Sequence, residues 1–139
     1  VPGVLIIDDD ESIYEIVDLA LSSIDISCMF AISAETGIEL AQQYQPRLIL
    51  MDLLLPDGMN GWEAIKILKS KPETQHIPII AFTASTGHYI RQAMQAGAEE
   101  FIVKPFSIGQ FQRTISKYVA ATHQWKASAE FYLSPTKPL

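Results

Sequence analysis

The chain has 139 residues, 48% of them hydrophobic, and carries a net charge of −6 with ten Lys and Arg residues, none of them clustered. This length fits one domain that can bury roughly 70% of its unfolded surface, and the scattered basic residues argue against nucleic acid or an anionic membrane as a direct partner. The single cysteine, Cys28, excludes an intramolecular disulfide and is typical of the reducing cytoplasm, while neither a membrane span nor a signal peptide is visible.

Five short apolar runs alternate with five segments of helical periodicity. The runs cover residues 4–7, 27–32, 47–51, 77–82 and 100–103. Between the runs, apolar residues recur every three or four positions, as from Ile13 to Ile24. Uninterrupted branched aliphatic runs are typical of strands buried on both faces of a parallel sheet. The sequence therefore predicts an α/β domain, a doubly wound flavodoxin-like (βα)5 fold with strand order 2-1-3-4-5 and right-handed crossovers.

Polar residues follow all five predicted strands, although Ser33, after the second strand, offers no reactive group. Asp8 to Asp10 end the first strand, Asp52 the third, Thr83 the fourth and Lys104 the fifth. In the order 2-1-3-4-5, the first and third strands are neighbours at the topological switch point, where ligands bind. Two carboxylates ~4 Å apart repel by roughly 4 kcal/mol at an effective dielectric near 20. The sequence therefore predicts either a hard divalent metal or a strongly raised pKa at this edge.

This set of residue types points to phosphoryl transfer. That reaction needs a nucleophile, in-line positioning, and neutralisation of charge on the phosphoryl oxygens. A carboxylate can attack phosphorus and become an acyl phosphate, and Mg²⁺ suits a site with one or two carboxylates and several waters. A hydroxyl and an ammonium on the opposite wall would hold the phosphoryl oxygens.

Four segments in this order resemble the receiver (CheY-like) domain of bacterial two-component response regulators. The segments are VLIIDDDES, LILMDLLLP, PIIAFTAS and AGAEEFIVKPF. Each segment alone is weak, but all four at nearly the right spacing are a strong signal. The resemblance covers about residues 4–120. It implies a phosphoacceptor signalling domain of a two-component or phosphorelay system, rather than an enzyme acting on external metabolites.

The resemblance also assigns the acidic residues. Asp52 is the implied phosphoacceptor and a metal ligand. Asp9 would bind Mg²⁺ directly, whereas Asp8 would hold the ion through water. The backbone carbonyl of Leu54 would complete the protein's share of the coordination.

The remaining implied roles concern the opposite wall of the site. Thr83 would bind a phosphoryl oxygen and shift on phosphorylation, and Lys104 would pair with the phosphate, its position set by a cis Lys104-Pro105 bond. Phe101 occupies the position of the aromatic switch residue, where tyrosine is commoner. On the residues alone, packing of Phe101 in the core is an equally good prediction.

The resemblance implies partners of two kinds. A histidine kinase or a histidine phosphotransfer protein would supply the phosphoryl group. A downstream protein, or a second copy of the chain, would bind the face formed by the fourth and fifth strands and the helix between them. We expect a receiver domain over residues 1–122, and a tail over residues 123–139 that acts as a linker or a docking segment.

The sequence is also compatible with two alternative functions. A haloacid-dehalogenase-type phosphatase would use Asp8 and Asp10 of an Asp-x-Asp motif, although the acidic pair such enzymes need after a late strand is missing. A receiver-shaped docking module would never accept phosphate. Asp10 itself is either a third metal ligand or a residue favoured at the start of a helix.

The sequence departs from the family pattern in two places. The glycine that follows the acceptor loop falls one residue late, at Gly61, and the span from Thr83 to Lys104 is about one residue short. Neither change touches the residues of the strand ends. In addition, the apolar side chain of Leu54 cannot hydrogen-bond an attacking water, so we expect it to influence the lifetime of the acyl phosphate.

Overall fold

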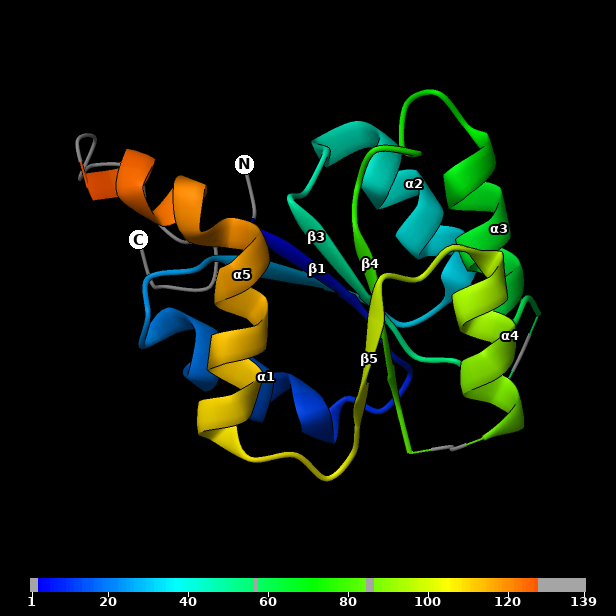
Figure 1. Ribbon diagram of the computed structural model, residues 1–139, viewed down its shortest axis with the longest axis horizontal. Helices are drawn as coiled ribbons and strands as arrows, with labels where there is room; N and C mark the ends of the chain where they lie inside the picture. The colour runs from blue at the N-terminus through cyan, green and yellow to red at the C-terminus, as the bar shows by residue number, and fades with distance from the viewer. Residues whose placement is uncertain (1–2, 57, 85–86, 128–139) are drawn as a thin grey trace.

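The computed structural model describes residues 3–56, 58–84 and 87–127, with side chains as far as residue 119. Strands and helices alternate along the described chain (Figure 1). The strands are β1 (Val4–Ile7), β2 (Cys28–Ala31), β3 (Leu48–Met51), β4 (Ile79–Thr83) and β5 (Glu100–Val103). The helices are α1 (Ser12–Ser22), α2 (Ala34–Tyr44), α3 (Gly61–Ser70), α4 (His88–Ala96) and α5 (Ile108–Ala127).

The strands form one parallel sheet in the order β2-β1-β3-β4-β5. Val4 of β1 pairs with Cys28 on one side and with Leu48 on the other, so β1, β2 and β3 start level with one another. The predicted fold class and strand order are thereby confirmed. Because β1 and β3 are neighbours in register, the residues that follow them emerge side by side at the carboxyl edge.

Helices cover both faces of the sheet (Figure 1). Helices α1 and α5 pack on one face, where Phe82 and Phe111 are the largest buried side chains. Helices α2, α3 and α4 pack on the other face, around residues such as Ile49 and Met51. All residues of β1, β3 and β4 are buried, as expected for strands covered on both sides.

Three strands differ in their bounds from those predicted. The third strand, expected over residues 47–51, begins one residue later, at Leu48. The fourth strand was expected over residues 77–82, but β4 begins at Ile79 and includes Thr83. Pro78 has no N–H to donate, and the Ile77 N–H donates to the carbonyl of Thr74 in a turn (3.0 Å), so the ladder begins later. The second strand, expected over residues 27–32, is confined to Cys28–Ala31.

Local capping explains where three helices begin. The hydroxyl of Ser33 accepts from the Thr36 N–H at the start of α2, and the Ser107 hydroxyl accepts from the Gln110 N–H (3.1 Å) at the start of α5. A complete capping box between Asn60 and Glu63 opens α3. This last cap fixes the end of the loop that follows β3, and so the position of the site.

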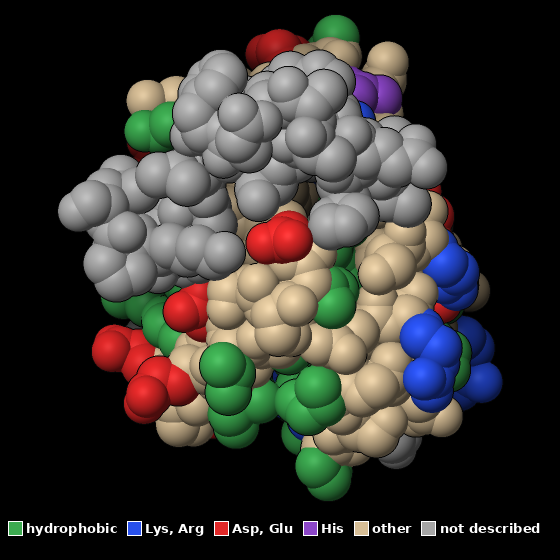
Figure 2. Space-filling view, turned by 90° about the vertical axis from the view of Figure 1, so that its left-hand side faces the viewer, with side chains coloured by type: hydrophobic (Ala, Val, Ile, Leu, Met, Phe, Trp, Pro, Cys, Tyr) green, Lys and Arg blue, Asp and Glu red, His purple; other side chains and the backbone are tan. Residues whose placement is uncertain are grey.

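Figure 2 looks onto the side of the molecule formed by α1 and α5. In this view several acidic side chains gather at the lower left and Lys and Arg side chains at the right, with exposed hydrophobic side chains between them in the lower part. Ile16 and Leu19 of α1 are 47% and 71% exposed, beside Glu15 and Asp18.

In the part of the chain that the structure describes, no helix combines the length and apolarity needed to cross a bilayer.

The predicted division at residue 122 remains a prediction. Helix α5 runs to Ala127 and so passes this position without a break in the backbone. The rest of the predicted tail, residues 128–139, lies outside the described residues.

Candidate functional site

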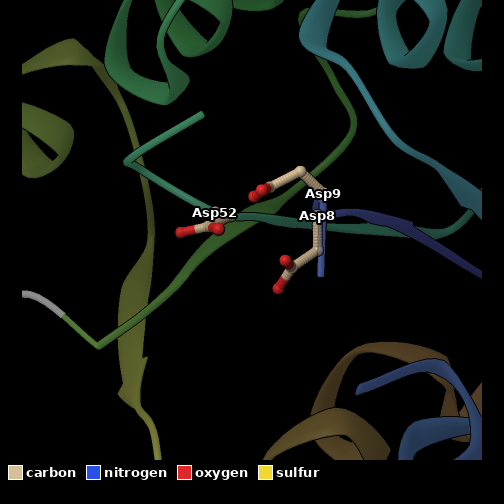
Figure 3. Close-up of side chains that lie close together, drawn as sticks. All are labelled: Asp8, Asp9 and Asp52. Atoms are coloured by element: carbon tan, nitrogen blue, oxygen red, sulfur yellow. The ribbon is translucent and has the colours of Figure 1, made fainter. Parts of the chain in front are cut away.

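Three acidic side chains meet at the carboxyl edge of the sheet. Asp8 and Asp9 follow β1 and Asp52 follows β3, and one carboxylate oxygen from each lies within 4.8 Å of the others (Figure 3). Asp8 is fully buried, Asp52 is 7% exposed, and Asp9 is exposed. Hydrogen bonds from the Asp8 N–H to the Ala31 carbonyl and from the Asp52 N–H to the Ile7 carbonyl, both 2.9 Å, extend the ladders and hold the acids level.

Lys104 places its ammonium between the two buried carboxylates. Its Nζ lies 2.6 Å from Oδ2 of Asp8 and 3.8 Å from Oδ2 of Asp52. The same ammonium lies 4.9 Å from the centre of the Phe82 ring, close enough for a cation–π contact. Among the described residues, the ammonium of Lys104 is therefore shared by two buried carboxylates, and it lies closer to Asp8 than to Asp52.

Asp52 is held in a state that disfavours its charge. Burial and the neighbouring carboxylates of Asp8 and Asp9 raise the pKa of Asp52 to about 7. The ammonium of Lys104 and the Leu54 N–H, which donates to Oδ1 of Asp52 (3.3 Å), oppose this rise. The pKa remains far above its usual range, so a bound cation would stabilise the ionised form strongly.

Thr83 and Lys104 are joined through their backbones. The Lys104 N–H donates to the Thr83 carbonyl (2.9 Å), which extends the pairing of β4 with β5 past the end of the strands. Thr83 is 1% exposed. The Lys104-Pro105 peptide is cis, as the resemblance implied. The strand ends therefore bring the predicted acids, the hydroxyl-bearing residue and the lysine to one edge.

Gly61 allows α3 to start directly against the loop that carries Asp52. A Cβ at this position would lie 2.2 Å from the Asp52 carbonyl oxygen and 2.6 Å from Cα of Leu53. The Gly61 N–H donates to the Leu53 carbonyl (3.1 Å). The glycine that the sequence places one residue late thus fits a close contact between two backbones.

Asp10 lies outside the acidic cluster. It is exposed, and its Oδ1 accepts from both the N–H (3.0 Å) and the hydroxyl (2.6 Å) of Ser12 at the start of α1. These hydrogen bonds lower the pKa of Asp10. This geometry supports the interpretation of Asp10 as a residue that favours the start of the helix.

Phe101 does not pack in the core. Its side chain is 48% exposed, so the core-packing prediction is wrong. Phe101 pairs with Ala81, and Thr83 lies two residues further along β4. Since side chains alternate along strands, Phe101 and Thr83 point to the same face of the sheet. The position suits a side chain that changes its burial, but the switching role remains a prediction.

The sequence interpretation missed two residues that support the site. The hydroxyl of Tyr14 donates to the Asp8 carbonyl (2.6 Å). Oε2 of Glu35, in the first turn of α2, accepts from the Met59 N–H (3.0 Å) and so braces the loop between Asp52 and α3. Both are hydrogen bonds between a side chain and the backbone of another segment, which helical and strand periodicity do not predict.

The donor set fits magnesium. Mg²⁺ prefers carboxylate, carbonyl and water oxygens at about 2.0–2.1 Å, so ligands on opposite sides of the ion are about 4 Å apart. The oxygens of Asp8, Asp9 and Asp52 lie within 4.8 Å of one another, and the ammonium of Lys104 compensates their negative charge only in part, so the cluster suits a cation.

Comparisons with known proteins agree with this geometry. The family model described as "Response regulator receiver domain" matches residues 4–116. The polar-differentiation response regulator DivK of Brucella ovis is 36% identical over 121 residues, which cover 84% of this chain and 95% of DivK. The uncharacterized transcriptional regulatory protein YcbL of Bacillus subtilis is 31% identical over 124 residues, covering 88% of this chain and 53% of YcbL. The response regulator PleD of Caulobacter vibrioides is 32% identical over 103 residues, covering 73% of this chain and 22% of PleD.

The chain thus spans about half of YcbL and about a fifth of PleD. Among solved structures, a putative response regulator from Chloroflexus aurantiacus superimposes with a TM-score of 0.78 at 27% identity, covering 86% of this chain and 99% of that one. The receiver domain of the sensor histidine kinase PA1611 from Pseudomonas aeruginosa, solved with magnesium in its active-site cleft, has the same fold with a TM-score of 0.77 at 24% identity, covering 84% and 96%. With the family model matching most of its length, this chain belongs to the response regulator receiver domain family.

Proposed function

We propose that Asp52 accepts a phosphoryl group from a phosphohistidine of a partner kinase or phosphotransfer protein, with Mg²⁺ as cofactor. One observation carries this proposal: the buried carboxylate of Asp52 lies between two further acids and the ammonium of Lys104. A carboxylate with a pKa of about 7 in this setting is poised to bind a cation and to act as a nucleophile. The proposed role is that of a phosphoacceptor, not of an enzyme for external substrates.

The chemistry follows from the positions of these residues. An ionised oxygen of Asp52 attacks phosphorus, and the bond between phosphorus and the donor's ring nitrogen breaks. The imidazole leaves with the bonding electrons and takes up a proton from water. The product is an acyl phosphate on Asp52. Lys104 moves from Asp8 towards the new phosphoryl group, and Thr83 binds one of its oxygens.

Magnesium would be held by Asp9 directly, by Asp8 through water, by Asp52, and by the backbone carbonyl of Leu54. When bound, the ion neutralises charge on the phosphoryl oxygens during transfer. A bound ion would also offset the repulsion from Asp8 and Asp9, which together with burial raises the pKa of Asp52. Asp8 would then exchange its pairing with Lys104 for a place in the ion's hydration shell, which leaves the ammonium available to the phosphate.

Signalling follows from the movement of Thr83. As its hydroxyl binds the phosphoryl group, the end of β4 shifts, and Phe101 turns from its exposed position towards the sheet. This change would alter the face formed by β4, β5 and α4, where we propose that a downstream protein or a second copy binds. We also propose a cytoplasmic location, because the lone thiol of Cys28 is typical of a reducing compartment.

Mass spectrometry after incubation with a small acyl phosphate and Mg²⁺ tests the assignment. We expect the wild-type chain to gain one phosphoryl group, and peptide mapping to place it on Asp52. The variant Asp52→Asn should gain none under the same conditions. Asp10→Asn is the matched control, since it removes a carboxylate nearby but outside the cluster, and it should be labelled like the wild type.

The same experiment separates the alternatives. Labelling of Asp8, together with loss of labelling in Asp10→Asn, would favour the phosphatase. A chain that gains no phosphoryl group from any donor would favour the constitutive docking module. A labile adduct that persists on Asp52→Asn would overturn the proposed acceptor.

A further inference from the structure

Tyr14 links helix α1 to the end of β1. Its hydroxyl donates to the Asp8 carbonyl (2.6 Å) and lies 3.4 Å from the Ala31 carbonyl. Its ring stacks on Phe30 of β2, with centroids 4.2 Å apart and an angle of 26° between the planes. The stacking fixes the direction of the ring, so the hydroxyl is held over the carboxyl ends of β1 and β2.

The contacted carbonyl belongs to the peptide that joins Asp8 to Asp9. Because a peptide unit is planar, the direction of the Asp8 carbonyl also fixes the direction of the Asp9 N–H. The position of the exposed Asp9 carboxylate then depends on only a few rotatable bonds beyond this plane. A hydrogen bond to the Asp8 carbonyl therefore restricts where the oxygens of Asp9 can lie.

Asp8 is already held at its other polar groups. Its N–H donates to the Ala31 carbonyl (2.9 Å), Oδ1 accepts from the Asp10 N–H (2.9 Å), and Oδ2 pairs with Lys104. The Tyr14 hydroxyl adds the contact at the carbonyl, which is the group that leads on to Asp9. This is the place where a donor outside the acidic cluster can affect the geometry of a metal ligand.

We propose that Tyr14 is a positioning residue that preorganises the Asp8–Asp9 peptide for binding of Mg²⁺. The inference rests on the proposed function, because it concerns the same ion. Tyr14 need not touch the metal or the phosphoryl group; it acts through the Asp8 carbonyl. Outer contacts of this kind that orient metal ligands typically contribute to metal affinity.

The hydroxyl remains a donor across the neutral pH range. Partial burial and the carboxylates of Asp8, Glu11, Asp9 and Asp10 raise the pKa of Tyr14 to about 12. The hydroxyl therefore keeps the proton that it donates to the Asp8 carbonyl throughout the neutral pH range.

The test compares two Tyr→Phe variants of the full chain. Tyr14→Phe keeps the ring that stacks on Phe30 and removes only the hydroxyl. Tyr118→Phe is the matched control: its hydroxyl binds Glu100 on β5, away from the acidic cluster. Dissociation constants for Mg²⁺ come from an NMR titration that follows the amides of residues 9 and 10. The carbonyl ¹³C shift of Asp8, recorded without metal, reports the hydrogen bond itself.

We expect Tyr14→Phe to weaken binding of Mg²⁺ by about three- to tenfold, which corresponds to one neutral hydrogen bond. The Asp8 carbonyl resonance should move in the same variant. Tyr118→Phe should lose stability as well, but it should bind Mg²⁺ as the wild type does. A purely structural role for Tyr14 would lower the stability of both variants and leave both affinities unchanged.

The outcomes separate the two proposals. Equal affinity of Tyr14→Phe and wild type for Mg²⁺ would overturn the positioning role and leave the phosphoacceptor proposal intact. An equal loss of affinity in both variants would also overturn it, because the effect would then be general. Absence of Mg²⁺ binding to the wild type would count against the proposed function itself.

Discussion

The two edges of the sheet both gather charged side chains, yet they differ in how those charges are satisfied. At the carboxyl edge, the side chains of Asp8, Asp9 and Asp52 lie together, and among the described residues the ammonium of Lys104 pairs with two of them, Asp8 and Asp52. At the amino edge of β4 and β5, the acid Glu99 and the cation Lys69 pair with each other and with backbone groups. The amino edge therefore contributes to the stability of the fold, whereas the carboxyl edge has the unbalanced charge expected of a binding site.

The amino edge shows how a satisfied polar cluster looks. Glu99 accepts from the Ile79 N–H (2.8 Å) with one oxygen and pairs with Lys69 (3.4 Å) through the other. Lys69 also donates to the Ile77 carbonyl (2.8 Å), and the buried Thr74 hydroxyl donates to the Leu68 carbonyl (2.6 Å). Each of these polar groups has a partner, so they give no reason to expect a ligand.

At the carboxyl edge, one ammonium does not balance the negative charge of the acidic side chains. Burial and two neighbouring acids raise the pKa of Asp52, while one ammonium at 3.8 Å only partly compensates. If this edge contributed only to stability, we would expect one of these acids to be absent. A destabilising cluster of acids at the topological switch point is instead typical of a functional site.

The largest expected effect comes from removing the one cation at the carboxyl edge. Lys104→Met leaves the fully buried Asp8 without its partner at 2.6 Å, so without metal we expect a loss of about 2–4 kcal/mol in the free energy of unfolding at pH 8. Saturating Mg²⁺ should restore much of this loss, because the ion replaces the missing positive charge. Urea unfolding with and without Mg²⁺ measures both quantities.

The control for this variant is Lys117→Met. Lys117 pairs with Glu100 (3.0 Å), but its side chain is 59% exposed, so removal should change stability by less than about 1 kcal/mol. The change should not depend on Mg²⁺. If both lysine variants lost the same free energy of unfolding, with the same dependence on Mg²⁺, the ammonium of Lys104 would contribute no more than that of an exposed lysine.

The sequence predicts the carboxyl edge well because strand ends are encoded locally. Each apolar run stops at a polar residue, and a parallel sheet brings those stops to one edge whatever the helices do. The sequence therefore correctly predicts that Asp8, Asp52 and Lys104 lie at this edge. The same reasoning gave the strand order, since short crossovers leave few topologies.

The remaining parts of the site depend on contacts between distant elements. Tyr14 fits the helical period of α1 like any half-buried aromatic residue, and only the packing of α1 against β2 shows that its hydroxyl reaches Asp8. Glu35 gives no sequence signal for its contact with the Met59 N–H. The exposure of Phe101 was equally undetermined, because β5 lies at the edge of the sheet, where strand periodicity does not decide burial.

The second prediction concerns Asp52 and pH. Its pKa of about 7 in the folded chain lies above the ~3.9 of an unfolded aspartate, so the folded state holds the proton more tightly. Stability therefore falls as the pH rises from ~4 to ~7. Asp52→Asn mimics the protonated form, and above pH 7 it should be more stable than the wild type by on the order of 1–3 kcal/mol. The gain should be smaller at pH 5, as unfolding curves at both pH values would show.

Asp10→Asn provides a control of opposite sign. The pKa of Asp10 is lowered by its hydrogen bonds to Ser12, so the ionised form favours the fold. Above pH ~4 the variant should therefore be less stable than the wild type by a constant amount, and this difference should disappear as the pH falls below ~4. A stabilising effect of Asp52→Asn that did not depend on pH would show that relief of repulsion is not its cause.

The smallest expected effect lies at the amino edge. In Glu99→Gln, the amide oxygen can still accept from the Ile79 N–H, and only the pairing with Lys69 is lost. Because this pair is partly exposed, the loss of stability should stay below about 1 kcal/mol, and it should be the same with and without Mg²⁺. A change in Mg²⁺ affinity in this variant would contradict the comparison, since it would mean that β4 and β5 couple the two edges. If Glu99→Gln leaves the Mg²⁺ affinity unchanged, the effects of the bound cation on stability are confined to the strand ends that carry Asp9, Asp52 and Lys104.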